Sequence, residues 1–151
     1  MAFYPTRNTL PEDIRLQAVD LLGKGLITAI DVQRHAKQAH WNVHGPNFIG
    51  LHLLFDEVHG AALAWADLCA ERLVALGGTA DGRVEHVAKQ TPLNPYPLQV
   101  KSGTEHVFAL AAALAAFGEQ VRGAIKASAN FDDATTSDLV GSIYRNFAWR
   151  R

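Results

Sequence analysis

The sequence predicts an all-α fold, a four-helix bundle with a long crossover between its second and third helices. Apolar residues recur at intervals of three and four over most of the chain, which is the helical period. A Gly-Pro-Asn turn at residues 45–47 separates the first two long segments and favours an antiparallel helix pair. Residues 79–101 carry three prolines, and a linker of this length lets the third helix run parallel to the second.

The first two helices are expected over residues 10–43 and 47–76. Thr9 and Glu12 have the spacing of a capping box at the start of the first helix. A Gly-Gly pair directly follows the second helix and supplies a natural C-terminal stop. Two long helices joined by so tight a turn should form an antiparallel hairpin.

The C-terminal half predicts one short helix, at about 84–89 in the crossover, and two longer ones. Ser102 and Glu105 form a second capping box, which opens an Ala-rich helix. The last helix is expected over 134–149, with one of the two aspartates that precede it as the N-cap.

Composition predicts a single domain over residues 1–151, with residues 1–9 as a short N-terminal extension. Hydrophobic residues make up 48% and charged residues 19%, which is a globular balance. No apolar run approaches the roughly 18 residues of a membrane span, and the N-terminus lacks a secretory signal. We therefore expect a cytoplasmic protein with no membrane partner. A single cysteine excludes an internal disulfide and a Cys-based zinc site, so any metal site must use His and carboxylates.

Two pairs of potential metal ligands lie on the second helix. His52 and Asp56 are four residues apart, and so are Asp67 and Glu71. At about 100° per residue, all four share one helix face. The pairs are nevertheless 15 residues apart, or about 22 Å along the helix, so one subunit cannot unite them on a metal ion.

A second copy of this helix, packed antiparallel about a two-fold axis, unites the pairs. The residue numbers of two facing positions then add to a constant. For both 52 with 71 and 56 with 67, this sum is 123. The axis falls between Ala61 and Ala62, where small side chains allow close approach. The sequence thus predicts an isologous dimer with two identical sites, each completed by His40 from the end of the first helix. Two imidazoles and three carboxylates suit iron, manganese or zinc, although a solvated helix face also carries such residues.

The stretch AHWNVHGPNFIGLHLLFDEV, at residues 39–58, and DLCAERLVALGG, at 67–78, resemble the signature of the Dps family of ferritin-like proteins, the DNA-binding proteins from starved cells. Weaker similarity in SGTEHVFALAAAL and DDATTSDL extends the resemblance through most of the chain. The resemblance implies a ferritin-like subunit that assembles into a hollow dodecamer. It also implies a ferroxidase, an oxidoreductase that oxidises Fe(II), usually with hydrogen peroxide rather than oxygen. The family stores the ferric product as mineral and so protects against oxidative damage.

The resemblance assigns a di-iron site at the dimer interface, where zinc or manganese can replace iron. His40, His52 and Asp56 would come from one subunit, and Asp67 and Glu71 from its partner. Trp41 is either an oxidisable neighbour of the site or a packing residue of the hairpin. Asp133 and Asp138 resemble the residues that line the family's iron-entry pore. They are otherwise ordinary acids at the start of a helix.

DNA binding is doubtful by the same comparison. Arg7 is the only basic residue before Thr9, whereas DNA-binding members carry a Lys/Arg-rich tail whose charges release counterions. The alternative interpretation is a nucleoid-associated DNA-binding protein with secondary iron chemistry, and a third is a structural shell with an inactive metal site. Residues with other expected places are Trp65 and Cys69 in the core, His59 at a solvated interface, and His35, His86 and His106 at the surface.

Overall fold

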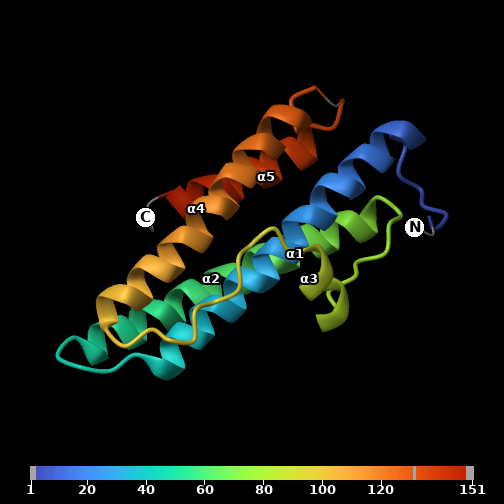
Figure 1. The fold of residues 1–151 in the computed structure, drawn as a ribbon. Coiled ribbons are helices and arrows are strands. Elements are labelled where there is room, and N and C mark those ends of the chain that lie inside the picture. Colours follow the sequence, from blue (N-terminus) through green and yellow to red (C-terminus); the bar gives the residue numbers. More distant parts are fainter. Residues whose placement is uncertain (1–2, 131, 149–151) are drawn as a thin grey trace.

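Figure 1 shows the computed structural model, which describes residues 3–130 and 132–148. The first two long helices form an antiparallel hairpin. The crossover then returns along the bundle, so that the third long helix runs parallel to the second and the last one runs antiparallel to it. This is the predicted connectivity. The helices are α1 (Glu12–Asn42), α2 (Phe48–Ala75), α3 (Val84–Gln90), α4 (Gly103–Ser128) and α5 (Ala134–Ala148).

The start of α1 differs from the prediction. Its N-cap is Pro11, and no side chain caps the helix, so the expected Thr9–Glu12 box is wrong. The turn before the helix is made by Asn8 instead, whose Oδ1 accepts a hydrogen bond from Leu10 N at 2.9 Å. An Asx turn at Asn8 therefore stands in place of the expected side-chain cap at Thr9.

The end of α2 is a Schellman motif that also holds the N-terminal extension. Gly77 has φ +94°, and Gly78 N donates to the Leu73 carbonyl at 3.1 Å. Tyr4 N donates to the Gly77 carbonyl at 2.8 Å, while Arg15 lies over the Phe3 ring at 5.0 Å. The segment before α1 is thus packed against the end of α2.

Two predicted caps are present in the second half of the bundle. Ser102 and Glu105 form the capping box of α4. At α5, Asp133 Oδ1 accepts from Thr136 N at 3.1 Å and from Arg72 of α2 at 2.7 Å. Asp133 therefore caps α5 and also ties that helix to α2 through a buried ion pair.

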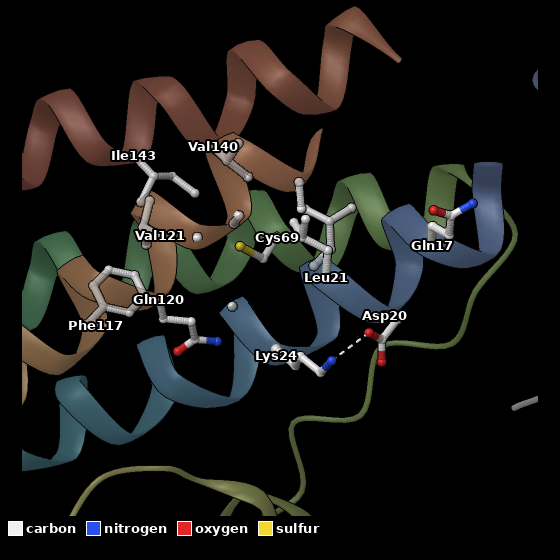
Figure 2. Close-up of a pocket in the computed structure, with 15 residues that line it drawn as sticks. Gln17, Asp20, Leu21, Lys24, Cys69, Phe117, Gln120, Val121, Val140 and Ile143 are labelled. Atoms are coloured by element: carbon white, nitrogen blue, oxygen red, sulfur yellow. Dashed lines mark hydrogen bonds and ion pairs between the residues drawn. The ribbon is translucent and has the colours of Figure 1, made fainter. Parts of the chain in front are cut away.

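The core is formed where all four long helices meet. Trp65 stacks on Phe117 with ring centroids 5.3 Å apart, and Cys69 is 3% exposed, so both predicted core residues are confirmed. A cavity of about 430 Å³ lies beside them between α1, α4 and α5, and Cys69 and Phe117 are among the residues that line it (Figure 2). Burial raises the pKa of the Cys69 thiol to about 12. This thiol is therefore an inert filler of the core.

One helix is more apolar than the sequence alone suggested. Among the described residues, α4 has the length and apolar composition to cross a membrane, and 33% of its most apolar stretch is buried inside the bundle. A helix in the core of a helical bundle has the same length and apolar composition. α4 packs between α1 and α5, which accounts for its buried apolar side.

Candidate metal centre

His40 and His52 face each other across the hairpin of α1 and α2. His40 Nδ1 donates to the His52 carbonyl at 2.8 Å, and His52 Nδ1 donates to the His40 carbonyl at 2.9 Å. The two rings stack with centroids 3.6 Å apart. Each histidine therefore fixes the orientation of the other.

These two hydrogen bonds decide which ring nitrogen is free. A carbonyl only accepts, so Nδ1 carries the proton in both rings, and a neutral imidazole then keeps its lone pair on Nε2. A bond from the other ring nitrogen to a carbonyl is the usual outer support of a metal-binding histidine. Two neighbouring imidazoles prepared in this way fit a divalent transition metal such as Fe(II).

Asp56 lies one turn after His52 on α2 and is held by a lysine of α1. Lys37 Nζ forms an ion pair with Asp56 Oδ1 across the hairpin. The hydrogen bond from Lys37 keeps the pKa of Asp56 below its ordinary value. The carboxylate is therefore charged and 49% exposed, but an ammonium group competes with any metal ion for it.

Asp67 and Glu71 lie further along α2, and both are exposed. The structure does not bring them to the histidine pair. Within residues 3–130 and 132–148 of one subunit, no three His, Cys, Asp or Glu side chains gather closely enough to hold a metal ion. One subunit therefore supplies a prepared pair of imidazoles and a nearby carboxylate, with the remaining two carboxylates about three turns or more away.

An exposed apolar stripe of α2 runs alongside the two sets of ligands and extends past them at both ends. Ile49, Leu53, Leu63 and Val74 are 66%, 58%, 51% and 54% exposed in the subunit. Their successive spacings of four, ten and eleven residues are close to whole numbers of helical turns, which places them on one side of the helix with the carboxylates. The predicted two-fold axis sets Ile49 opposite Val74, because these numbers also add to 123. The stripe therefore has the composition and register of a self-complementary helix contact.

The other candidate residues are placed as follows. Trp41 is 64% exposed, so it is not a packing residue of the hairpin within the subunit. Asp133 is 3% exposed and is used inside the subunit by Arg72, whereas Asp138 is exposed and lies 3.5 Å from Arg145. The pore role stays a prediction, and Asp138 is the residue of the two whose carboxylate faces outward.

Several contacts are not predicted by the sequence patterns. One is the ion pair of Lys37 with Asp56, a candidate ligand. His35 and His106 were expected at the surface and are 7% and 1% exposed, because the crossover covers them. His59 Nδ1 lies 3.3 Å from the Gln33 carbonyl, which leaves its Nε2 free beside Asp56. Those contacts join segments distant in sequence, so helical spacing alone does not reveal them.

Comparison with known proteins shows which family this chain resembles. A family model described as a ferritin-like domain matches residues 27–147. The DNA protection during starvation protein of Agrobacterium fabrum is 34% identical over 146 residues, covering 97% of this chain and 90% of the relative.

Solved structures show the same similarity. The structure of Dps from Microbacterium arborescens in the high iron form has a TM-score of 0.88 at 30% identity, covering 97% of this chain and 93% of that one. DpsC from Streptomyces coelicolor has a TM-score of 0.93 at 29% identity, covering 99% and 87%.

Proposed function

Because the chain belongs to the Dps family of ferritin-like proteins, we propose that it is a ferroxidase that oxidises Fe(II) at intersubunit di-iron sites and stores the ferric product. Hydrogen peroxide is the proposed oxidant. The protein then protects against oxidative damage by removing both reagents that together form hydroxyl radical.

The reciprocal pair of His40 and His52 is the observation that carries this proposal. Its two hydrogen bonds leave both Nε2 atoms available at the surface of the hairpin. Such a pair has no role in the apolar core, and it lies beside a charged carboxylate, Asp56. Imidazole and carboxylate together suit Fe(II).

The exposed stripe of α2 supports the shared site. A second copy packed against it covers four large apolar side chains and brings Asp67 and Glu71 to the first copy's histidines. Burial of that apolar surface stabilises the dimer. Assembly of such dimers into a hollow dodecamer is the arrangement that the resemblance implies, and it provides the interior for ferric mineral.

The chemistry follows from placing two Fe(II) ions side by side. Peroxide takes one electron from each ion, together with two protons, and leaves two Fe(III) ions and two water molecules. Paired delivery avoids the one-electron step that releases hydroxyl radical. His40 and His52 hold iron through nitrogen, Glu71 anchors the tighter position, and Asp56 serves the weaker one after Lys37 yields it.

Stopped-flow measurement of Fe(II) oxidation tests the proposal. We expect faster oxidation with peroxide than with oxygen, and loss of the fast phase in Glu71→Ala with the assembly intact, because Glu71 is exposed and its removal creates no core cavity. Glu85→Ala, which removes an exposed carboxylate of α3, is the matched control and should retain the rate. A fast phase that survives in Glu71→Ala would contradict the site.

A further inference from the structure

A second polar cluster lies under the crossover, apart from the histidine pair. Thr91 of the crossover donates to Asp31 of α1 at 2.5 Å, and Asp31 lies 3.6 Å from His35 Nε2. The His35 and Tyr96 rings form a T-shaped pair, with centroids 5.4 Å apart. The Tyr96 hydroxyl in turn lies 2.6 Å from His106 Nδ1 of α4. The crossover is thus fixed to α1 and α4 by polar contacts with two buried histidines and the partly buried Asp31.

The Tyr96–His106 pair has the form of a phenol donating to a neutral imidazole. Burial lowers the pKa of His106, which keeps the ring uncharged and its Nδ1 available as an acceptor. Burial also raises the pKa of Tyr96 to about 12, so the phenol keeps its proton. No other group is hydrogen-bonded to that hydroxyl among the described residues, and His106 is therefore the one base to which the phenol can pass a proton directly.

The pair lies close to the proposed iron ligands. The His106 ring is 6.4 Å from the ring of Phe55, which precedes Asp56 on α2. The backbone of Asn42, two residues after His40, favours the protonated form of His106 and so raises its pKa, although burial outweighs it. Packed rings therefore connect Tyr96, through His106 and Phe55, with the ligand-bearing part of α2.

We propose that Tyr96 and His106 form a proton-coupled electron donor for one-electron oxidants. Tyr96 gives one electron to hydroxyl radical, which becomes hydroxide, while the phenol proton moves to His106 Nδ1. The products are a neutral tyrosyl radical and an imidazolium ion. A later Fe(II) returns the electron and His106 returns the proton, which restores the pair and yields Fe(III). The inference rests on the proposed function in one respect, which is that Fe(II) and peroxide supply the hydroxyl radical.

The arrangement makes this a reversible site rather than a site of damage. The His35 ring packs at 85° against the Tyr96 ring, and the Tyr96 hydroxyl lies against the buried ring of His106. A shielded phenoxyl radical cannot couple with a second one from another chain. Exposed Tyr4, at 59%, has no such cover and provides a comparison within the same protein.

The test uses the assembled protein without iron and azide radical, a one-electron oxidant generated by pulse radiolysis. We expect a tyrosyl radical, assigned by electron paramagnetic resonance with ring-deuterated tyrosine. Tyr96→Phe should remove most of this signal, whereas Tyr4→Phe should keep it. His106→Gln retains a hydrogen-bond acceptor but no base, and should slow formation of the radical by about a hundredfold, the lower end of what a positioned base contributes.

A second arm repeats the measurement with Fe(II) and peroxide, and this separates the two proposals. An undiminished tyrosyl signal in Tyr96→Phe, or an unchanged rate in His106→Gln, overturns the electron-donor assignment whatever the ferroxidase does. A Tyr96 radical with azide radical but no iron oxidation in the wild type overturns the proposed function and keeps the redox pair. Thermal unfolding of each variant confirms that the loss of signal comes from a folded protein.

Discussion

Among single residues, Lys37 has the most direct influence on the proposed iron site. Its ammonium group pairs with the Asp56 carboxylate, which the proposed site assigns to the weaker iron position. Metal binding there therefore has to displace a cation that the subunit itself supplies. The sequence contained a signal for this pair. In an antiparallel hairpin, the residue numbers of two facing positions add to a nearly constant value, which the turn at residues 45–47 fixes. His40 with His52 and Lys37 with Asp56 follow this rule.

Lys37→Met should bind the second Fe(II) of each site several-fold more tightly than the wild type, because methionine keeps the length of the side chain and removes the competing charge. Anaerobic calorimetric titration with Fe(II) measures this directly. Lys24→Met is the control, since Lys24 pairs with Asp20 at an exposed position of α1 away from the histidines. Equal affinities in all three proteins would show that Lys37 does not compete.

Between elements, the contact that places α5 is the buried pair of Asp133 and Arg72. The side chains of these residues are 2% and 14% exposed, and Thr136 donates to the same carboxylate. The sequence predicted that an aspartate caps this helix, since capping is a local pattern. It did not predict Arg72, because the partner lies 61 residues away and depends on how α5 meets α2. Helix ends were predictable to within about two residues for the same reason.

Asp133→Ala should lower the free energy of unfolding by about 3 kcal/mol or more, because it removes a cap and leaves Arg72 buried without its partner. Burial alone would raise the pKa of Asp133, but the hydrogen bonds from Thr136 and Arg72 more than offset it and lower that pKa. The pair therefore stabilises the fold above the ordinary range of a carboxyl pKa, and this stability is lost as pH falls through the depressed value. Urea unfolding at neutral and acidic pH should show a difference between wild type and variant that shrinks in acid. Asp132→Ala, at the exposed neighbour, should change little.

Gly123→Ala in α4 should stabilise the bundle by about 0.5–1 kcal/mol, because alanine favours the helix. A Cβ at Gly123 meets no atom within 4 Å, and the residue lines the cavity of Figure 2. Gly77→Ala is the opposite case, since its φ is +94° and a Cβ would lie 2.8 Å from the Tyr4 carbonyl oxygen. In thermal unfolding, the midpoint temperature should rise for the first variant and fall for the second. A midpoint that falls in both variants would show that the space beside Gly123 is filled in solution.

For the whole molecule, the main expectation is that function needs two copies. The subunit holds a prepared histidine pair at one end of α2 and two carboxylates at the other. This division was predictable from the sequence, because helical geometry sets the distance between the pairs. The hydrogen bonds that prepare the histidines were not, because they depend on the exact register of α1 against α2.

Reassembly of two inactive variants tests the sharing of sites. His52→Ala and Glu71→Ala should each be nearly inactive, since every site lacks a ligand. After unfolding, mixing and refolding, about half the dimers are mixed, and each mixed dimer has one site with both lesions and one with none. About a quarter of the wild-type rate should return. A mixture no more active than its parents, with exchange confirmed by mass spectrometry, would reject a shared site.

The reciprocal hydrogen bonds of His40 and His52 also have an evolutionary consequence. Each ring is oriented by the backbone of the other's residue and stacks on the other's ring. A substitution at either position removes one imidazole and its half of the stack, but the backbone carbonyl that accepts from the other ring remains in place. The hydrogen bond that orients each histidine therefore survives loss of the other. On the proposed function, the two positions can be lost one at a time, and each loss costs the site one nitrogen ligand.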